Sequence, residues 1–345
     1  MKTIVLTGGG SAGHVVPNLA LLPALQKLCR AAYVGTDGIE RRLVREAGIP
    51  FYTVNAPKLV RGAPWRNLTL WHRLRKSVAE AEAVLQKLSP ALVFSKGGYA
   101  ALPAALAANR LGIPVVTHES DLSPGLANRV IARRAVLTLT GFPETAARLP
   151  RAKYAGAPVR GELFAADRAA ALRRYGFSGA KPVLLCFGGG SGSAALSAAL
   201  GAALPALLPR FDVLHIRGRA AGAAAKPGYV CTEFERDMAA AYAAADYVLA
   251  RAGANTVFEL LALKKPALLV PLENRRSRGD QVENALYFSR RGLVHVLRER
   301  QLSPAALQTA LQALQADTAL PAALHKSGYR AGNAAIVREL APFLA

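Results

Sequence analysis

Short apolar runs of strand length alternate along this chain with longer segments that have the spacing or the alanine content of helices. In the first half, the helical patterns lie at 18–29, 70–87 and 104–109. The apolar runs between them predict strands at 3–7, 31–34, 51–54, 92–94, 115–117 and 136–139. Because strands that alternate with helices form parallel βαβ units, this half indicates a doubly wound α/β sheet.

The same alternation starts again after residues 149–161, a basic segment with prolines and glycines that we interpret as a linker. The second set of predicted strands covers 183–187, 213–217, 229–232, 247–250 and 267–270. The fold class is therefore α/β, with two doubly wound Rossmann-like domains facing an interdomain cleft. We place the domains at 1–155 and 156–325. The helical tail at 326–345 could pack on either domain, and packing back on the N-terminal domain is one possibility.

Composition fits a two-domain protein of the reducing cytoplasm. The 345 residues are 52% hydrophobic, which is enough for two cores. Cys29, Cys186 and Cys231 are scattered and show no metal spacing. Met1 and Lys2 lead directly into a predicted strand, and no charge-free stretch is long enough to span a bilayer. We therefore expect a protein made and kept in the cytoplasm.

The net charge of +22 predicts an anionic partner, either a lipid surface or a polyanion. A charged, solvated surface is the plain alternative. Nucleic acid receives little support, because the sequence has no zinc-finger spacing and no RNP-type signature. The aromatic content of 7% also leaves few side chains for base stacking.

Two glycine-rich loops follow predicted strands and precede helical runs. They read Gly8-Gly9-Gly10-Ser11-Ala12-Gly13-His14 and Gly188-Gly189-Gly190-Ser191-Gly192. Each offers backbone N–H groups and the positive end of a helix to a phosphate. The first loop also has the glycine spacing of a dinucleotide fold, with Asp37 as the ribose acid, but alone this signal is weak. His14 stands where a P-loop needs lysine, which disfavours a nucleoside-triphosphate hydrolase.

His14 is also the candidate base of this loop. A histidine at a helix start could simply cap or pack the helix. The functional interpretation is a base or a phosphate-binding group, because the neighbouring glycines give the ring little side-chain cover. The positive end of a helix favours the neutral imidazole, which can accept a proton.

Residues 251–259 form a second strand–turn–helix unit with phosphate-binding character. The backbone N–H groups of Ala254, Asn255 and Thr256 would meet a diphosphate at the helix start. Glu259 lies four residues after Asn255 on the same helix face, where its carboxylate could accept both hydroxyls of a ribose. The alternative is a solvated helical acid, which the apolar neighbours of Glu259 disfavour.

The ordered combination of motifs resembles a known family. The segments are His118-Glu119-Ser120-Asp121 leading into 124–129, then 156–160, 237–242, 251–259 and Gly279-Asp280-Gln281-Val282-Glu283-Asn284-Ala285. Together they resemble the MurG-type N-acetylglucosaminyltransferases of bacterial cell-wall synthesis, in glycosyltransferase family 28. The resemblance covers nearly the whole chain, from residue 3 to about residue 284.

This resemblance implies a GT-B fold and an inverting transfer of N-acetylglucosamine. The donor would be UDP-N-acetylglucosamine, and the acceptor would be the 4-hydroxyl of the muramoyl unit of a polyprenyl-diphosphate-linked muramoyl peptide (lipid I). The product would be lipid II, for peptidoglycan synthesis. The enzyme would act as a peripheral protein at the cytoplasmic face of the cell membrane.

The resemblance also implies roles for particular residues. His14 is the expected base, Glu119 is the reserve candidate, and His118 would orient the loop. The expected donor-binding residues are Arg160, Ser191, Phe234, Glu235, Ala254, Asn255, Thr256, Glu259, Asp280 and Gln281. The expected acceptor- and diphosphate-binding residues are Gly10, Ser11, Gly13, Gly97, Gly98, Tyr99, Asp121 and Asn128. Asn284 could equally be structural.

Two sequence features depart from the pattern of the family. The second glycine loop continues with Gly192 and Ser193, where the family usually has glutamine and glycine, which affects the diphosphate contacts. Asp121 stands where many relatives have asparagine, at the acceptor site. The chain has no D-x-D pair, so we expect neither a metal ion nor another cofactor.

A basic segment with both tryptophans of the chain is the candidate membrane-docking surface. Tryptophan favours the headgroup boundary, and basic side chains favour anionic lipids. We assign Lys58, Arg61, Trp65, Arg66, Trp71 and Arg73 to it. The alternative is that the tryptophans pack in the core. Arg275, Arg276 and Arg278 form a second basic cluster that could serve the donor sugar or solvent.

Other functions remain open from sequence. A related GT-B transferase could use another lipid acceptor such as diacylglycerol, and a UDP-N-acetylglucosamine epimerase would need no acceptor. The alternative from another class is a basic nucleic-acid-binding protein that retains a nucleotide fold.

Overall fold

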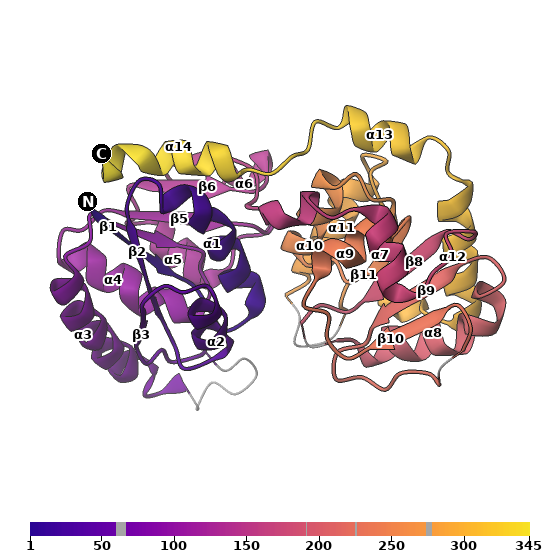
Figure 1. Ribbon diagram of the computed structural model, residues 1–345. Coiled ribbons are helices and arrows are strands. Elements are labelled where there is room, and N and C mark those ends of the chain that lie inside the picture. The colour runs from indigo at the N-terminus through magenta and orange to yellow at the C-terminus, as the bar shows by residue number, and fades with distance from the viewer. Residues whose placement is uncertain (60–66, 191, 225, 274–277) are drawn as a thin grey trace. The chain divides into compact units, whose positions relative to one another are not determined.

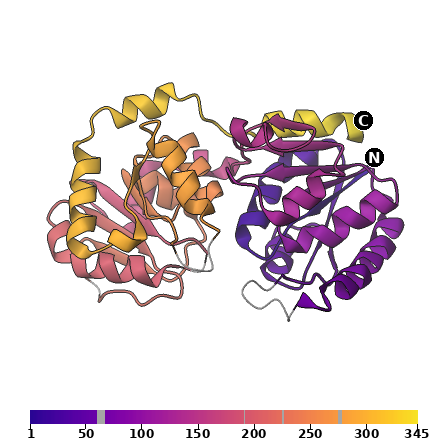
Figure 2. The same cartoon turned by 180° about the vertical axis from the view of Figure 1, so that it is seen from behind.

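The computed structural model describes residues 1–59, 67–190, 192–224, 226–273 and 278–345. The chain divides into two compact units, an N-terminal unit of residues 1–160 with 331–345 and a C-terminal unit of residues 161–330 (Figures 1 and 2). The first unit thus runs to residue 160, where we expected 155, and the chain returns to it at residue 331, where we expected a terminal helix from 326.

The N-terminal unit is built on a seven-stranded sheet in the order β3-β2-β1-β4-β5-β6-β7, and every pairing between these strands is parallel. Its strands are β1 (Thr3–Thr7), β2 (Arg30–Gly35), β3 (Phe51–Thr53), β4 (Leu92–Ser95), β5 (Val115–Glu119), β6 (Leu137–Thr140) and β7 (Ala152–Tyr154). Alternate residues of β1 face opposite sides of the sheet: Ile4 and Leu6 join one apolar cluster, and Val5 joins the other.

Helices cover both faces of this sheet. Residues of α1, α2 and α14 share the cluster of Ile4, and residues of α3, α4 and α5 share that of Val5. The helices of the unit are α1 (Ala12–Leu25), α2 (Ile39–Glu46), α3 (Leu70–Leu88), α4 (Leu102–Arg110), α5 (Leu126–Ala132), α6 (Pro143–Ala146) and α14 (Asn333–Leu344).

The terminal helix α14 belongs to the N-terminal unit (Figure 1). Its residues Ile336, Leu340 and Leu344 recur at helical spacing, and all three are buried in the cluster of α1. Asn333 fixes the start of the helix, because its side chain donates to the carbonyl of Ala20 (2.8 Å) and accepts from the N–H of Val159 (2.9 Å). These contacts hold α14 against residues of the N-terminal unit that are distant from it in the sequence.

The C-terminal unit repeats the same arrangement with six parallel strands, in the order β10-β9-β8-β11-β12-β13. The strands are β8 (Val183–Phe187), β9 (Asp212–Ile216), β10 (Tyr229–Thr232), β11 (Tyr247–Ala250), β12 (Ala267–Leu269) and β13 (His295–Val296). The helices are α7 (Arg168–Tyr175), α8 (Ala194–Leu207), α9 (Met238–Ala244), α10 (Ala254–Ala262), α11 (Asp280–Ser289), α12 (Pro304–Ala316) and α13 (Leu320–Lys326).

In both units the strand order reverses beside the first strand. This point lies between β1 and β4 in one sheet and between β8 and β11 in the other. Doubly wound sheets bind ligands outside the carboxyl ends of the strands at such a reversal. Both glycine loops therefore lie where the topology favours a binding site.

The structure confirms two doubly wound parallel sheets and corrects several local predictions. The predicted linker at 149–161 contains an edge strand, β7, which pairs with β6. The two-residue strand β13 was not predicted. Helix α1 begins at Ala12, six positions before the predicted start, because the helix continues through Pro17.

Candidate active site

Two loops meet at the carboxyl ends of β1 and β4. Gly10 has a φ of +81°, and a Cβ there would lie 2.3 Å from a ring carbon of Tyr99. Gly97 and Gly98 have φ values of +82° and +79°, which favour glycine. A Cβ at Gly98 would lie 3.0 Å from the imidazole of His14. The structure therefore brings together five of the predicted positions, and glycine is favoured at three of them, Gly10, Gly97 and Gly98.

His14 lies half-buried in the first turn of α1. Its Nδ1 is 3.1 Å from the main-chain oxygen of Lys96. A carbonyl oxygen can only accept, so Nδ1 carries the hydrogen of the neutral ring and Nε2 carries the lone pair. This tautomer suits a general base that acts through Nε2.

Glu119, the reserve candidate, is held in a closed hydrogen-bond network. Its side chain is buried, and its carboxylate accepts from the N–H groups of Asp121 and Gly125 and from Nδ2 of Asn128, each at 2.9 Å. A carboxylate with these three donors stabilises the loop after β5. The geometry therefore favours His14 over Glu119 as the base. Asn128 is itself 3% exposed and supports Glu119.

The first glycine loop offers fewer amides to an anion than the sequence suggests. The carboxylate of the fully buried Glu40 lies 3.4 Å from the N–H of Gly10, and it also accepts from the N–H of Thr36 at 3.2 Å. The protein's own carboxylate thus faces Gly10, one of the expected acceptor-binding positions. Ser11 and Gly13 are exposed.

Lys96 is a residue of this site that sequence analysis missed. Its side chain is 2% exposed, and its Nζ lies 2.7 Å from Nδ1 of His118 and donates to the hydroxyl of Ser120. Burial lowers the pKa of Lys96 to about 7, although Glu119 and Asp121 favour the ammonium. One sequence feature could have identified Lys96: it is a charged residue between a buried apolar strand and the pair Gly97-Gly98.

In the C-terminal unit, the start of α10 has the expected backbone geometry. Gly253 precedes the helix in an extended conformation (ψ 138°) and has no side chain to cap it. Ala254, Asn255 and Thr256 form the first turn, so their N–H groups are directed out of the helix start.

Glu259 lies one turn further along α10 and is 8% exposed. The hydroxyl of Tyr242, on α9, donates to its Oε2 at 3.1 Å. A buried carboxylate with this neutral partner is not the solvated helical acid that we considered as the alternative. Its position relative to the first turn suits a group that accepts hydrogen bonds from a ribose.

Phe234 and Glu235 follow the carboxyl end of β10. The ring of Phe234 is 58% exposed, so it presents an apolar face to solvent. The carboxylate of Glu235 accepts from the hydroxyl of Tyr175 (3.0 Å) and from the N–H of Asp237 (2.8 Å). These bonds hold the side chain of Glu235, one of the expected donor-binding residues.

Asp280 and Gln281 begin α11 directly after Gly279, whose φ is +81°. The side-chain oxygen of Gln281 accepts from the N–H of Leu272 at 3.0 Å, which ties the helix start to the segment after β12. Asp280 accepts from Arg278 at 3.3 Å. Both side chains are half-buried.

Arg251 connects three of the loops around this site. It is 8% exposed and donates to the hydroxyl of Ser193 (2.7 Å), to the carbonyl of Val270 (3.1 Å) and to Glu299. Ser193 also caps α8 by accepting from the N–H of Leu196. Ser193, which stands where the family usually has glycine, therefore stabilises both the start of α8 and the position of Arg251. Ser191 lies outside the described residues, and Arg160 is the last residue of the N-terminal unit before the division.

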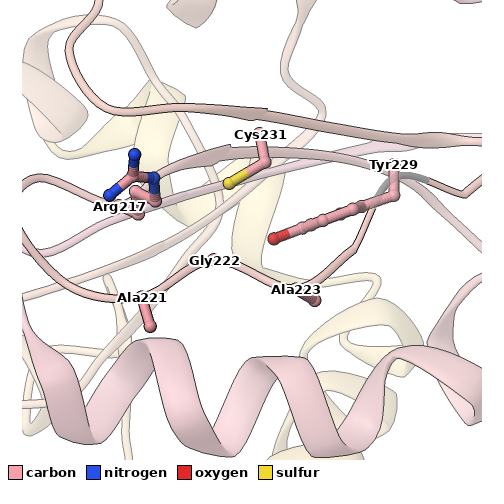
Figure 3. Close-up of a pocket in the computed structure, with 6 residues that line it drawn as sticks. All are labelled: Arg217, Ala221, Gly222, Ala223, Tyr229 and Cys231. Atoms are coloured by element: carbon pink, nitrogen blue, oxygen red, sulfur yellow. The ribbon is translucent and has the colours of Figure 1, made fainter.

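Two cavities in the described part of the chain are lined by residues other than the predicted site residues. One of about 490 Å³ is lined by Arg217, Ala221, Gly222, Ala223, Tyr229 and Cys231. Figure 3 shows the Cys231 sulfur and the Tyr229 hydroxyl pointing toward the segment 221–223. A second, of about 300 Å³, lies in the N-terminal unit next to the loop after β5, and three of its lining residues are Arg129, Arg133 and Arg148.

The described part of the docking segment is exposed. Leu68 and Trp71 are 83% and 74% exposed, and Lys58, Arg73 and Lys76 are also exposed. Trp71 therefore does not pack in the core. Arg61, Trp65 and Arg66, together with Arg275 and Arg276 of the second cluster, lie outside the described residues. Within the described ranges, no helix is long and apolar enough to cross a bilayer.

No group of three or more histidine, cysteine, aspartate or glutamate residues that could hold a metal ion occurs among the residues that the structure describes.

Two α/β domains with parallel sheets of this order are found in glycosyltransferases of the GT-B class, and comparisons with solved structures show that class. Acinetobacter baumannii MurG has a TM-score of 0.76 with 25% identity over 99% of both chains. A calicheamicin glycosyltransferase shares the fold, with a TM-score of 0.73 and 18% identity over 100% of this chain and 98% of that one.

The sequence matches the glycosyltransferase family 28 N-terminal domain over residues 4–139 and the C-terminal domain over residues 183–336. A Lachnospira eligens protein is 42% identical over 92% of both chains, and a Geobacillus kaustophilus protein is 42% identical over 91% of this chain and 90% of its own. Both are named UDP-N-acetylglucosamine--N-acetylmuramyl-(pentapeptide) pyrophosphoryl-undecaprenol N-acetylglucosamine transferase. The chain belongs to glycosyltransferase family 28.

Proposed function

We propose that this enzyme transfers N-acetylglucosamine from UDP-N-acetylglucosamine to the 4-hydroxyl of the muramoyl unit of lipid I, forming lipid II for peptidoglycan synthesis. The observation that carries the proposal is the 42% identity, over 92% of both chains, to a relative named for this reaction. The geometry of both units is compatible with it.

The C-terminal unit would bind the donor. The start of α10 offers main-chain N–H groups to the diphosphate, and Glu259 accepts the ribose hydroxyls. Phe234 and the backbone of Glu235 contact the uracil, while Asp280 and Gln281 contact the sugar. Arg160 and Ser191 are our candidates for additional diphosphate contacts. Negative charge that develops on the leaving UDP would be stabilised by these fixed donors.

The N-terminal unit would bind the acceptor. Ser11 and Gly13 lie next to His14 in the first glycine loop, Tyr99 lies against Gly10, and Asp121 lies on the loop that Glu119 stabilises. Nε2 of His14 would remove the proton from the acceptor hydroxyl as its oxygen attacks the anomeric carbon and UDP leaves. A single displacement of this kind inverts the configuration at that carbon.

Release of UDP with different acceptors tests the proposal. The enzyme should release UDP from UDP-N-acetylglucosamine when a short-chain lipid I analogue is added, and only slowly without it. Equal release with diacylglycerol would favour a different lipid acceptor. Conversion of the donor sugar without any acceptor would indicate an epimerase, and nucleic-acid binding without UDP release would indicate the non-enzymatic alternative.

The lipid acceptor requires the enzyme to reach a bilayer, and we propose that it docks peripherally on the cytoplasmic face of the membrane. Lys58, Arg73 and Lys76 are exposed, as are Leu68 and Trp71. Tryptophan at the headgroup level and cations near anionic lipids would stabilise this contact.

Charge reversal tests this surface. The variant Lys58→Glu/Arg73→Glu/Lys76→Glu should bind anionic vesicles about 100-fold more weakly, because each basic residue contributes about 1 kcal/mol near such a surface. Vesicle sedimentation measures the change. The control, Lys27→Glu/Arg30→Glu/Arg45→Glu, reverses three exposed charges elsewhere in the same unit. Equal weakening in both variants would contradict a localised docking surface.

A further inference from the structure

Lys96 connects two parts of the N-terminal unit that carry the proposed acceptor chemistry. It follows β4 directly and precedes Gly97 and Gly98, and its side chain is 2% exposed. A lysine is rarely buried to this extent, because its ammonium loses its hydration. The contacts of both its main chain and its side chain indicate what this burial achieves.

The main chain of Lys96 orients the base. Its carbonyl oxygen accepts from Nδ1 of His14 at 3.1 Å, which assigns the lone pair to Nε2. The following glycines hold this peptide close to α1, because a Cβ at Gly98 would lie 2.6 Å from the carbonyl oxygen of Gly9. A Cβ at Gly8 would lie 3.3 Å from Cβ of Lys96. Lys96 therefore lies directly against the first glycine loop.

The side chain of Lys96 supports the loop that follows β5. Nε2 of His118 is 2.8 Å from the carbonyl oxygen of Gly156, so Nε2 carries the hydrogen and Nδ1 accepts from Nζ of Lys96. Nζ also donates to the hydroxyl of Ser120. These two bonds hold both ends of the segment 118–120, which carries Glu119 and leads into Asp121.

The charge at Nζ changes near neutral pH. Glu119 and Asp121 are the acidic groups that act on it, while His118 is neutral, because burial and the nearby Lys96 hold its pKa well below the ordinary value. Nδ1 of His14 faces the main-chain oxygen of Lys96. With a pKa of about 7, Lys96 is cationic below neutrality and neutral above it.

We propose that Lys96 is a positioning residue of the acceptor site: its carbonyl orients His14, its amine supports the loop at 118–121, and the affinity for an anionic acceptor depends on the charge at Nζ. The inference rests on the proposed function, because it requires an acceptor that carries a diphosphate. A cation in a buried environment is weakly screened and attracts an anion bound at the neighbouring loops.

The pH dependence of the acceptor KM tests this proposal. In the parent enzyme, the KM for a short-chain lipid I analogue should rise about tenfold as the pH increases from about 6 to about 8, since Nζ loses its charge. In Lys96→Met, this KM should be about tenfold higher at low pH and constant over the range, with the donor KM unchanged. Lys96→Arg, which stays charged, should keep a low, constant acceptor KM.

The control Lys27→Met removes an exposed lysine of the same unit and should retain the parental profile. If Lys96→Met keeps the parental rise in acceptor KM, the positioning role is overturned while the proposed function stands. If the parent itself transfers no sugar, the proposed function fails instead.

A second variant covers the case in which Lys96→Met does not fold, as judged by thermal unfolding. Ser120→Ala removes one hydrogen-bond partner of Nζ and leaves the lysine in place. The midpoint of the rise in acceptor KM should then move to lower pH, because the ammonium loses a stabilising contact. An unchanged midpoint would overturn the proposal.

Discussion

Replacing His14 by alanine should lower kcat by about 10²–10⁴-fold, the usual contribution of a general base. The affinity for UDP should stay unchanged, because the C-terminal unit would bind the donor. His14 lies half-buried in the first turn of α1, outside the apolar clusters, and Nδ1 donates to the main-chain oxygen of Lys96, so we expect the loss to affect the chemical step rather than the core. Steady-state turnover with saturating donor and acceptor measures the effect.

Two further variants separate the base from the structure around it. His14→Gln can still donate to the carbonyl of Lys96 but offers no basic nitrogen, so it should be as slow as His14→Ala. His325→Ala removes an exposed histidine of α13 and should turn over like the parent. Turnover of His14→Ala within a few-fold of the parent would exclude His14 as the base.

Removing the carboxylate of Glu259, which would accept from two ribose hydroxyls, should weaken donor binding by at least about 100-fold. Hydrogen bonds to a charged group contribute about 1.5–3 kcal/mol each, and 1.4 kcal/mol corresponds to a factor of ten. Glu259→Ala should therefore raise the KM for UDP-N-acetylglucosamine and reduce the heat of UDP binding in calorimetry. The acceptor KM should not change.

The partner of Glu259 provides the matched control. Tyr242→Phe removes one hydrogen bond to Oε2 and keeps the carboxylate, so it should weaken UDP binding only a few-fold. Glu162→Ala removes an exposed acid of the same unit and should have no effect. If Glu259→Ala binds UDP as tightly as the parent, the proposed ribose contact is wrong.

Local patterns predicted both sheets because their central strands are buried, continuous apolar runs such as Thr3–Thr7 and Val183–Phe187. The edges were harder to predict. Strand β7 has the burial pattern of a half-exposed segment, and β13 has only two residues. The packing of α14 on α1 was left open, because it depends on contacts such as Asn333 with Ala20, more than three hundred positions apart.

Motifs identified the positions around the candidate site but not the hydrogen bonds that fix their roles. His14, Glu119 and Glu259 could all be selected as polar residues next to predicted strand ends or on helix faces. The sequence could not reveal that Glu119 is held by three donors, or that Lys96, 82 positions from His14, supplies its main-chain partner. The role of Arg251 was likewise not visible in the sequence, because its partners Ser193 and Glu299 follow β8 and β13 and lie near it only in the folded chain.

The configuration of the new glycosidic bond tests the central claim most directly. The product formed from UDP-N-acetylglucosamine and a short-chain lipid I analogue would be isolated, and its anomeric coupling and linkage position measured by NMR. The account predicts a β-linked N-acetylglucosamine on the muramoyl 4-hydroxyl, the outcome of one inverting displacement of the α-linked donor. A retained α configuration, or no sugar attached to the muramoyl unit, would contradict it.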